Sequence, residues 1–557
     1  MLEAFVQRTK IAYFSMEIAL QPEIHTYAGG LGILAGDTMR SCGDLELPVV
    51  FVTLLSRYGY LKQVIDAAGR QVEEPAPWEP AHWATPMGAK IAVEIAGREV
   101  WVRPWLYVHR GGPGYAVPVI LLDTDADENA EEDRTITRVL YGGDRAYRLS
   151  QEIVLGIGGV RLLRSLGFEI ETFHMNEGHA ALLALELLRH RPHPNGGGYD
   201  VDRVRERCVF TTHTPVEAGH DRFPYDLVRQ LLTGFMDVAD IMPFAGPDCL
   251  NMTRLALALS GYVNGVAKRH AEISRRLFPG FRIHAVTNGV HVETWTSPGF
   301  AALFQQCQPT WRHEPELLVR ADRLDDEAVW NAHRSAKEAL LGAVLDRTGL
   351  TLSPDVPVFG FARRMTGYKR PDLLFSDPDR LRRLAGRHPF QVIVAGKAHP
   401  DDEPGKRMIE AIHRHAEALA GAVPVVFLPD YDMALAKLMT SGSDVWLNTP
   451  LPPLEASGTS GMKAALNGVL NLSVLDGWWM EAYIEGATGW AIGDADLGTA
   501  SDDAADLYQA METRVLPLYY GDRTRWIWMM KQSISKIASY FNSQRMMRRY
   551  ASEAYLR

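Results

Sequence analysis

The chain alternates short, continuous apolar runs with longer segments in which apolar residues recur at helical spacing. The short runs predict buried strands at residues 11–16, 49–54, 207–211, 283–287, 358–362, 391–395, 425–428 and 445–448. The longer segments predict helices at residues 180–189, 325–345, 407–419 and 433–439. Strands that alternate with helices in this way are typical of parallel α/β layers.

The length of the chain predicts more than one domain. Its 557 residues exceed what one hydrophobic core organises, so two or three domains are expected. Two Rossmann-like halves fit the pattern, an N-terminal half at residues 1–295 and a C-terminal half at residues 296–557. The last segment, residues 522–557, is rich in aromatic and basic residues and predicts terminal helices.

Composition and charge narrow the class of protein. The formal net charge of −10 argues against a general nucleic-acid or anionic-membrane surface, although it is compatible with a local basic pocket for phosphate. No apolar run approaches the roughly 18 residues that cross a bilayer, and the N-terminus lacks the basic and apolar regions of a signal peptide. The 4 cysteines are scattered without a CxxC pair. We therefore expect a reduced, cytoplasmic compartment.

The segment 455–468 has the strongest chemical signature. It reads Glu-Ala-Ser-Gly-Thr-Ser-Gly-Met-Lys, ending at Lys463, and continues into an apolar stretch that predicts a helix with Lys463 in its first turn. Helix N-termini bind phosphate because their first N–H groups lack intrahelical partners. The spacing does not fit the nucleotide P-loop. Lys463 is therefore either a phosphate contact or an imine-forming amine, and spacing alone leaves both open.

A glycine loop near the N-terminus follows an apolar strand and opens a predicted helix. Gly29, Gly30 and Gly32 permit close approach of the backbone to a ligand phosphate. The pattern GxGxxxG is one residue longer than the dinucleotide fingerprint, which disfavours NAD. A simple strand-to-helix turn explains the same residues equally well.

A basic cluster follows the first strand of the second half. Arg363, Arg364 and Lys369 come directly after the run 358–362, and the carboxyl end of a parallel strand is where α/β sheets bind ligands. Charge-assisted hydrogen bonds contribute roughly 1.5–3 kcal/mol each, so such a cluster is able to hold two phosphates close together. The alternative is a solvated basic turn.

Polar residues at other strand ends suit a sugar rather than a metal. His213 and Asn288 each follow a predicted strand, although a lone histidine at a strand end is usually structural. His174 and His179 are five positions apart, which is not the HExxH spacing, and we expect structural histidines there. The acidic stretch 123–133 lacks the glycine and the last glutamate of a calcium loop. No metal site is therefore predicted.

The residues Glu455-Ala-Ser-Gly-Thr, followed after two positions by Met462 and Lys463, resemble the cofactor-lysine segment of the α-glucan (glycogen, starch and maltodextrin) phosphorylases. Other segments between residues 13 and 493 support this resemblance. It implies that Lys463 holds pyridoxal 5′-phosphate as a Schiff base. It also implies the GT-B fold, in which two Rossmann-like domains face each other across a cleft and C-terminal helices cross back to the first domain.

The resemblance further implies roles for individual residues. It assigns the substrate phosphate to Arg364, Lys369, Gly30 and the neighbours of Gly30, and the glucosyl unit to His213, Asn288, Glu455, Ser457 and Gly458. Arg364, Lys369 and His213 form the implied catalytic group. Besides Lys463, the cofactor contacts are assigned to Arg363, Thr459, Ser460 and Tyr431. Two positions depart from the family, which more often has lysine at 363 and asparagine at 461.

The implied activity is phosphorolysis of the terminal glucose of an α-1,4-glucan to α-glucose 1-phosphate, with retention and with inorganic phosphate as co-substrate. The family is usually dimeric, so a homodimer is the corresponding expectation. The short N-terminus has no place for the phosphorylation segment and nucleotide-effector site of the animal enzymes, so we expect a constitutive enzyme. Two other functions stay open: a nucleotide-sugar-dependent α-glucan synthase of the same fold, and a catalytically silent glucan-binding protein.

Overall fold

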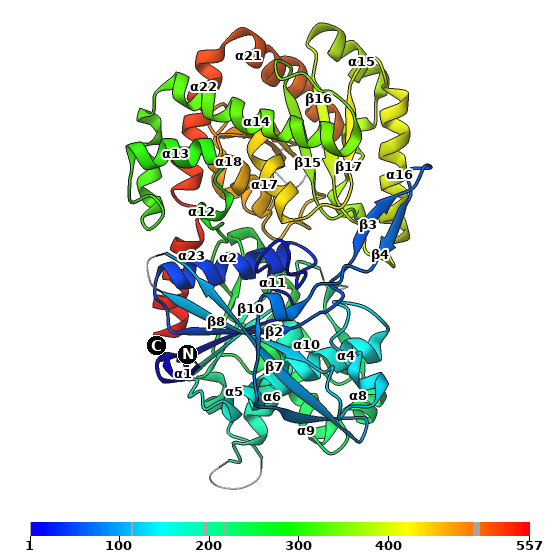
Figure 1. Cartoon of the computed structure of the whole chain (residues 1–557), viewed down its shortest axis with the longest axis vertical. Coiled ribbons are helices and arrows are strands. Elements are labelled where there is room, and N and C mark those ends of the chain that lie inside the picture. Colours follow the sequence, from blue (N-terminus) through cyan, green and yellow to red (C-terminus); the bar gives the residue numbers. More distant parts are fainter. Residues whose placement is uncertain (1, 113–114, 194–197, 217–218, 494–501, 557) are drawn as a thin grey trace. The chain divides into compact units, whose positions relative to one another are not determined.

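The computed structural model describes residues 2–112, 115–193, 198–216, 219–493 and 502–556 (Figure 1). The chain folds as two compact units. The first comprises residues 1–61, 75–286 and 546–557, and the second comprises residues 62–74 and 287–545. Two short segments thus belong to a different unit from the chain that leads into them.

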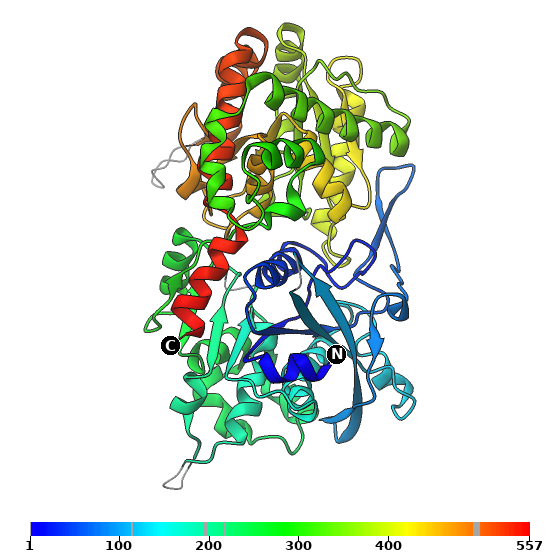
Figure 2. The ribbon, with the colours of Figure 1, turned by 60° about the vertical axis from the view of Figure 1, so that its left-hand side comes forward.

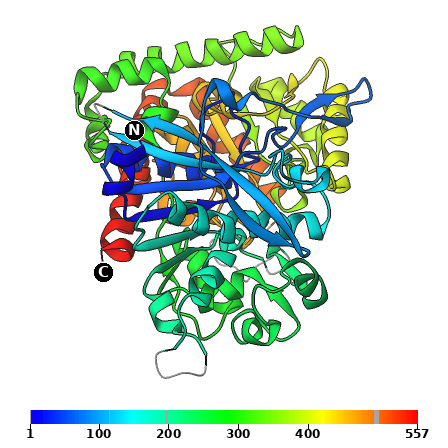
Figure 3. The same cartoon turned by 60° about the horizontal axis from the view of Figure 1, so that its bottom comes forward.

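The first unit is built on a sheet with a parallel centre and an antiparallel edge. Its order is β14-β13-β10-β9-β1-β2-β8-β7-β5, and β6 pairs with β7. The strands β1, β2, β7 and β8 run side by side across Figure 3. The parallel strands are β14 (His284–Ala285), β13 (Tyr262–Gly265), β10 (Cys208–Thr211), β9 (Thr172–Asn176), β1 (Ile11–Ser15), β2 (Val49–Leu54) and β8 (Ala116–Asp123). The antiparallel ones are β7 (Arg98–Arg110), β6 (Ile91–Ile95) and β5 (Thr85–Pro86).

The second unit is built on a fully parallel sheet, ordered β17-β16-β15-β18-β19-β20. The strand order reverses between β15 and β18, and ligands of open α/β sheets bind beyond the carboxyl ends of the strands at such a switch point. The strands are β17 (Val425–Leu428), β16 (Gln391–Ala395), β15 (Val358–Ala362), β18 (Val445–Asn448), β19 (Leu470–Val474) and β20 (Gly489–Ile492). The molecule is therefore a mixed α/β protein with two main parallel sheets.

Most of the predicted elements are confirmed, with small shifts at their ends. The runs at 49–54, 358–362, 391–395, 425–428 and 445–448 match strands residue for residue. The predicted strand 283–287 shortens to β14, and β9 was missed because Thr172 and His174 break the apolar run. The predicted helices correspond to α6 (Leu182–Arg189), α14 (Asp326–Thr348), α16 (Glu403–Ala418) and α17 (Met433–Gly442).

The C-terminal segment forms the predicted helices and ends on the first unit. The helices α22 (Arg523–Ser533) and α23 (Ser543–Tyr550) lie within residues 522–557. Beyond residue 545 the chain joins the core of the first unit (Figure 2). There the Tyr555 hydroxyl lies 2.7 Å from Nδ1 of His174, and the Tyr262 hydroxyl donates a 2.8 Å hydrogen bond to Glu553. Across the described ranges, no helix has the length and apolar content needed to span a bilayer.

Candidate functional site

The predicted basic cluster and the predicted lysine loop meet at the switch point of the second unit. Arg363 directly follows β15, and Lys369 ends a short 3₁₀ turn, Gly367–Lys369. Glu455 lies in the loop between β18 and α18 (Thr459–Leu466). Because β15 and β18 are parallel neighbours, their carboxyl ends bring these three side chains together.

Glu455 is the counter-ion of both cations. Its Oε2 lies 2.6 Å from Nζ of Lys369 and 2.7 Å from Nη1 of Arg363, and all three side chains are buried. Burial alone raises the pKa of the Glu455 carboxyl, but Arg363 and Lys369 more than offset burial and lower the pKa to about 2. The structure thus presents an ionised triad with an excess positive charge. The role implied for Glu455, a hydrogen bond to a sugar hydroxyl, stays a prediction.

The two arginines of the cluster differ in their surroundings. The Arg363 guanidinium also donates to Oδ1 of Asn448, whose Nδ2 donates a 3.1 Å hydrogen bond to Oγ of Ser473. Arg364 is exposed, and no hydrogen bond or ion pair joins its guanidinium to another described residue. Arg363 is therefore held in place by the fold, whereas Arg364 keeps its hydrogen-bonding capacity for solvent or a ligand.

Lys463 is a buried amine that rests on an aromatic ring. It lies just past the first turn of α18, one turn further in than predicted. Its Nζ is 3.7 Å from the centroid of the Trp295 ring, in the range of a cation–π contact. Asn467 ties the two residues together, because its Nδ2 donates to the Lys463 carbonyl at 3.0 Å and to the Trp295 carbonyl at 2.8 Å. Trp295 was missed by sequence reasoning, since nothing in the chain connects it to residue 463 before folding.

Two glycines of the lysine loop are required for different local reasons. Gly458 caps α18 with a φ of +93°, a left-handed conformation that favours glycine. Gly461 is crowded: a Cβ there would collide with Oδ1 of Asn471 and lie 2.6 Å from Cζ2 of Trp478. Asn471 also donates a 3.1 Å hydrogen bond to the Gly461 carbonyl. Packing against β19 and Trp478 therefore leaves no room for a side chain at position 461.

Unsatisfied polar atoms accompany this cluster in the second unit. Oγ of Ser457 and Oδ1 of Asn288 are buried and have no hydrogen-bond partner among the described residues. Of the predicted cofactor contacts, Thr459 and Ser460 start α18, and Tyr431 follows β17 and packs on the core. Ser460 Oγ accepts a 3.1 Å hydrogen bond from the Trp446 indole. A buried polar atom without a protein partner is satisfied by a ligand, an ion or an ordered water, and other described side chains such as Thr9 and Thr53 share this condition.

The donor set fits pyridoxal 5′-phosphate. A buried primary amine, Lys463, suits an aldehyde, the flat ring of Trp295 suits an aromatic ring, and the cations Arg363 and Lys369 suit a phosphate. The Tyr431 side chain at the end of β17 adds an aromatic group to the same edge of the sheet. The residues present thus match each chemical part of the cofactor.

In the first unit, His213 is held as a neutral ring. It follows β10; its backbone N–H donates to Oε2 of Glu177 at 2.7 Å, and its ring Nε2 lies 2.6 Å from Oδ1 of Asn176. Burial, followed by the neighbouring histidines, lowers the pKa of His213 to about 3. Burial also raises the pKa of Glu177 despite the hydrogen bonds that its carboxylate accepts. His174 is structural, since its Nε2 contacts Oγ1 of Thr211 at 2.8 Å.

The glycine loop already holds a carboxylate of the protein. Oε2 of Glu17 accepts hydrogen bonds from the N–H groups of Ala28 at 2.6 Å and Gly29 at 3.0 Å. A Cβ at Gly32 would lie 2.6 Å from the same oxygen, so packing explains that glycine. At Gly30 a Cβ would meet nothing within 4 Å, and packing gives no reason for glycine there. Glu17 was missed by sequence reasoning, although its position just after β1 was the available signal.

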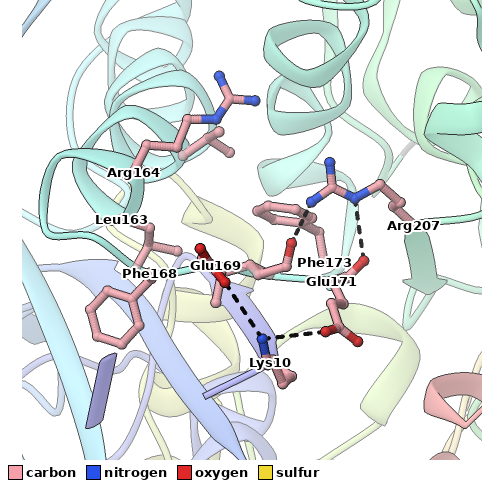
Figure 4. Close-up of a pocket in the computed structure, with 10 residues that line it drawn as sticks. Lys10, Leu163, Arg164, Phe168, Glu169, Glu171, Phe173 and Arg207 are labelled. Atoms are coloured by element: carbon pink, nitrogen blue, oxygen red, sulfur yellow. Dashed lines mark hydrogen bonds and ion pairs between the residues drawn. The ribbon is translucent and has the colours of Figure 1, made fainter. Parts of the chain in front are cut away.

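A pocket of about 310 Å³ lies at the opposite edge of the first unit's sheet, where β1, β9 and β10 begin (Figure 4). Its charged groups pair with each other and with the backbone. Lys10 lies 3.9 Å from Glu169 and 3.4 Å from Glu171, and Arg207 donates to the Glu171 and Ile170 carbonyls. The pocket is therefore not the candidate site. No group of three metal-ligating side chains occurs in the part of the chain that the structure describes.

Comparisons with known proteins identify relatives of this chain. A family model described as carbohydrate phosphorylase matches residues 239–487. The maltodextrin phosphorylase of Thermococcus litoralis is 38% identical, covering 98% of this chain and 70% of the relative. The glycogen phosphorylase of Mycobacterium tuberculosis is 38% identical, with 98% and 71% covered. The glycogen phosphorylase of Aquifex aeolicus is 36% identical, with 98% and 86% covered.

Proposed function

The chain belongs to the carbohydrate phosphorylase family, and on this basis we propose that it is an α-1,4-glucan phosphorylase that depends on pyridoxal phosphate. The reaction is the reversible transfer of the terminal glucose of an α-1,4-glucan to inorganic phosphate, with retention, giving α-glucose 1-phosphate. The observation that carries this proposal is the buried triad of Glu455, Arg363 and Lys369 at the switch point, on the same sheet edge as the Lys463 loop.

The triad suits the binding of two phosphates. Glu455 compensates only one of its two cations, so the cluster keeps a positive charge before Arg364 is counted. Two phosphates at close range repel each other, and fixed cations in a water-poor site offset that repulsion more strongly than they would in water. Lys369 and Arg364 are the proposed ligands of inorganic phosphate, and Arg363 is the proposed ligand of the cofactor phosphate.

Lys463 is the proposed point of covalent attachment. When bound, pyridoxal phosphate supplies its 5′-phosphate as a proton-transfer partner of inorganic phosphate. Trp295 covers one side of the Lys463 amine, which excludes water and limits the directions in which the side chain is able to point. Thr459, Ser460 and Tyr431 complete the proposed cofactor contacts.

Glucose recognition is assigned to neutral groups and to unsatisfied atoms. Ser457 Oγ and Asn288 Oδ1 are the buried atoms that a sugar hydroxyl would satisfy, which makes them sensitive to stereochemistry. Gly458 joins them through its backbone. From the N-terminal half, residues 1–295, the proposal takes His213 for the glucosyl unit and Gly30 for the substrate phosphate, and the C-terminal half, residues 296–557, carries the cofactor. The proposal includes the GT-B arrangement that is usual for the family.

The direct test is phosphorolysis by the purified protein. Maltoheptaose and inorganic phosphate are incubated with the protein, and α-glucose 1-phosphate is measured with a coupled assay. Parallel reactions replace phosphate and maltoheptaose by ADP-glucose or UDP-glucose and a maltodextrin acceptor. Turnover only with a nucleotide sugar would establish a synthase instead, and glucan binding without turnover in either reaction would establish a binding protein.

The cofactor is tested independently by spectroscopy. We expect absorbance of bound pyridoxal phosphate above 300 nm, and reduction with borohydride should fix the adduct on the peptide that contains Lys463. Lys463→Ala should lose both the absorbance and phosphorolysis, whereas the matched control Lys536→Ala, at an exposed lysine of the same unit, should keep both. Full activity of Lys463→Ala would contradict the assignment.

A further inference from the structure

A hairpin from the early part of the chain is built into the second unit. β3 (Lys62–Ile65) and β4 (Gln71–Glu74) pair antiparallel, with Gln63 opposite Glu73. The chain on both sides of the hairpin belongs to the first unit. The hairpin lies beside α16 (Figure 1), where Glu73 pairs with Lys406 at 3.1 Å. Two of its glutamines are buried, Gln63 with 2% and Gln71 with 6% of its surface exposed.

Gln63 binds the loops that follow two strands of the sheet. Its Nε2 donates to the Gly396 carbonyl at 2.9 Å, after β16. Its Oε1 accepts from the N–H of Asp430 at 2.8 Å, after β17, and its own N–H donates to Oδ1 of Asp430 at 3.0 Å. The same Asp430 oxygen pairs with Lys397 at 2.6 Å. One buried side chain therefore joins the carboxyl ends of β16 and β17.

Gln71 completes the attachment. Its amide forms a reciprocal pair with the backbone of Ala398, donating to the carbonyl at 3.0 Å and accepting from the N–H at 2.9 Å. Oε1 of Gln71 also accepts from Nε2 of Gln63 at 2.8 Å. Nε2 of Gln71 donates in addition to Glu73 at 2.7 Å. Both amides are fully engaged, which fixes their orientation and that of the loop at residues 396–398.

The loop at residues 396–398 and the end of β16 support the backbone of residues 363–365 through hydrogen bonds. The N–H of Met365 donates to the Lys397 carbonyl at 2.9 Å, and the N–H of Arg363 donates to the Ala395 carbonyl at 3.2 Å. Gly396 has a φ of +151°, and a Cβ there would overlap the Arg363 carbonyl oxygen. The two main chains are therefore in direct contact. On the other side, Asp430 immediately precedes Tyr431, a proposed contact of the cofactor.

We propose that the hairpin is a positioning element of the cofactor and phosphate site, and that Gln63 and Gln71 act through the loops at 396–398 and 430 to place Arg363 and Tyr431. The inference rests on the proposed function. Neither glutamine touches the reacting groups. Both glutamines hold the backbone segments that support Arg363 and Tyr431. Displacements well under 1 Å in such supporting contacts are enough to weaken a site.

The test uses holoenzyme variants that keep the side-chain shape. Gln63→Met and Gln71→Met keep the length and bulk of the side chain, add no charge, and remove the amide donor and acceptor. The matched control is Lys62→Ala on the same hairpin, because the ion pair of Lys62 with Glu74 at 3.1 Å is exposed. For each protein we measure the dissociation constant of pyridoxal phosphate by reconstitution, the KM for phosphate and for maltoheptaose, and Tm with and without the cofactor.

We expect both glutamine variants to bind pyridoxal phosphate about 10-fold more weakly, as for the loss of a buried hydrogen bond. The KM for phosphate should rise by a similar factor, while the KM for maltoheptaose and the control stay as in the wild type. The gain in Tm on adding the cofactor should shrink in the glutamine variants, since stabilisation by a ligand grows with the logarithm of its affinity for the folded state.

Equal losses of Tm with and without the cofactor, at unchanged cofactor affinity, would overturn the inference, since the hairpin would then be merely structural. Wild-type values for both variants would overturn it as well. A wild type that binds no pyridoxal phosphate would overturn the proposed function together with this inference, and this result would be seen before any variant is made.

Discussion

Two buried carboxylates lie at strand ends in the two units, and opposite kinds of donor hold them. Glu17 of the first unit accepts from two backbone N–H groups and from the hydroxyl of Tyr141 at 2.8 Å, all of them neutral donors. Glu455 of the second unit accepts from two cations. Two backbone N–H groups of the glycine loop in the first unit are therefore already bound to the carboxylate of Glu17 and do not face a ligand. The second unit keeps positive charge for a ligand.

The same difference extends to the neighbouring groups. In the first unit, burial keeps His213 neutral, with a pKa of about 3, and raises the pKa of Glu177. In the second unit, charge pairing keeps Glu455 ionised, with a pKa of about 2. Neutral hydrogen-bonding groups suit sugar hydroxyls, whereas fixed cations suit phosphates. The comparison predicts that charge changes will be severe in the triad of Glu455, Arg363 and Lys369 and mild at His213.

The largest effect is expected from Glu455→Gln, which removes the shared counter-ion and leaves two buried cations facing each other. Because folding lowers the pKa of Glu455 from 4.5 to about 2, its charge stabilises the fold above pH 4.5, and this stabilisation is lost as pH falls from 4.5 toward 2. At pH 7 the variant should lose about 3 kcal/mol of unfolding free energy. Urea titrations in phosphate-free buffer between pH 3 and 7 measure the difference.

The control for this variant is Glu338→Gln, which changes a carboxylate with 59% of its side chain exposed in the same unit. Its unfolding free energy should follow that of the wild type at every pH, since exposed ion pairs contribute little. If Glu455→Gln also followed the wild type, the triad would not be electrostatically coupled, and the contrast between the units would lose its basis.

The next effect is expected from Lys369→Met, which keeps bulk and removes one cation. We expect kcat/KM for phosphate to fall about 10- to 100-fold, as for the loss of one charge-assisted hydrogen bond. The KM for maltoheptaose should change little. Arg414→Met, at an arginine with 67% of its side chain exposed, is the matched control. An equal loss for both substrates would mean that Lys369 supports the fold of the site rather than phosphate.

Sequence reasoning found the parts of this site that lie within one segment. The apolar runs of the second sheet are continuous and bounded by turns, so strands such as β15 and β18 were predicted to the residue. The residues that follow these strands were predicted for the same reason, since parallel strands place their carboxyl ends together. The lysine loop was identified from its own sequence, because that sequence resembles the cofactor-lysine segment of the α-glucan phosphorylases.

Relations between distant segments could not be predicted. Nothing in the sequence indicates that Glu455 is the partner of Arg363, because that contact needs the order β16-β15-β18. Trp295 beneath Lys463 and the glutamine contacts of the β3–β4 hairpin depend on tertiary packing in the same way. Glu17 fills a site that the glycine pattern alone predicts to be open. The local sequence pattern predicts the helices and strands, whereas the order of the strands in the sheet determines which charged side chains come into contact.

A smaller effect is expected from adding a methyl group at the two glycine-bearing helix starts. Gly461→Ala should lower the unfolding free energy by about 1–3 kcal/mol, because the new Cβ collides with Asn471 and Trp478. Gly30→Ala, where a Cβ meets nothing within 4 Å, should leave stability nearly unchanged and raise only the KM for phosphate. Urea unfolding and initial rates separate the two. Gly342→Ala, at an exposed and uncrowded helical position, is the control and should stabilise slightly.

The smallest effect is expected from the titration of His213, which should not respond to pH in the range where free histidines do. Burial lowers the pKa of His213 from 6.5 to about 3, so its contribution to stability is fully present above pH 6.5 and is lost progressively as pH falls from 6.5 toward 3. Long-range 15N–1H spectra, with the His213 signals identified by their absence in His213→Asn, should show a neutral ring from pH 5 to 8. A His213 ring that gains a proton near pH 6.5 would place a positive charge at the proposed sugar contact too, and the contrast between the neutral ring of His213 and the cations around Glu455 would then be wrong.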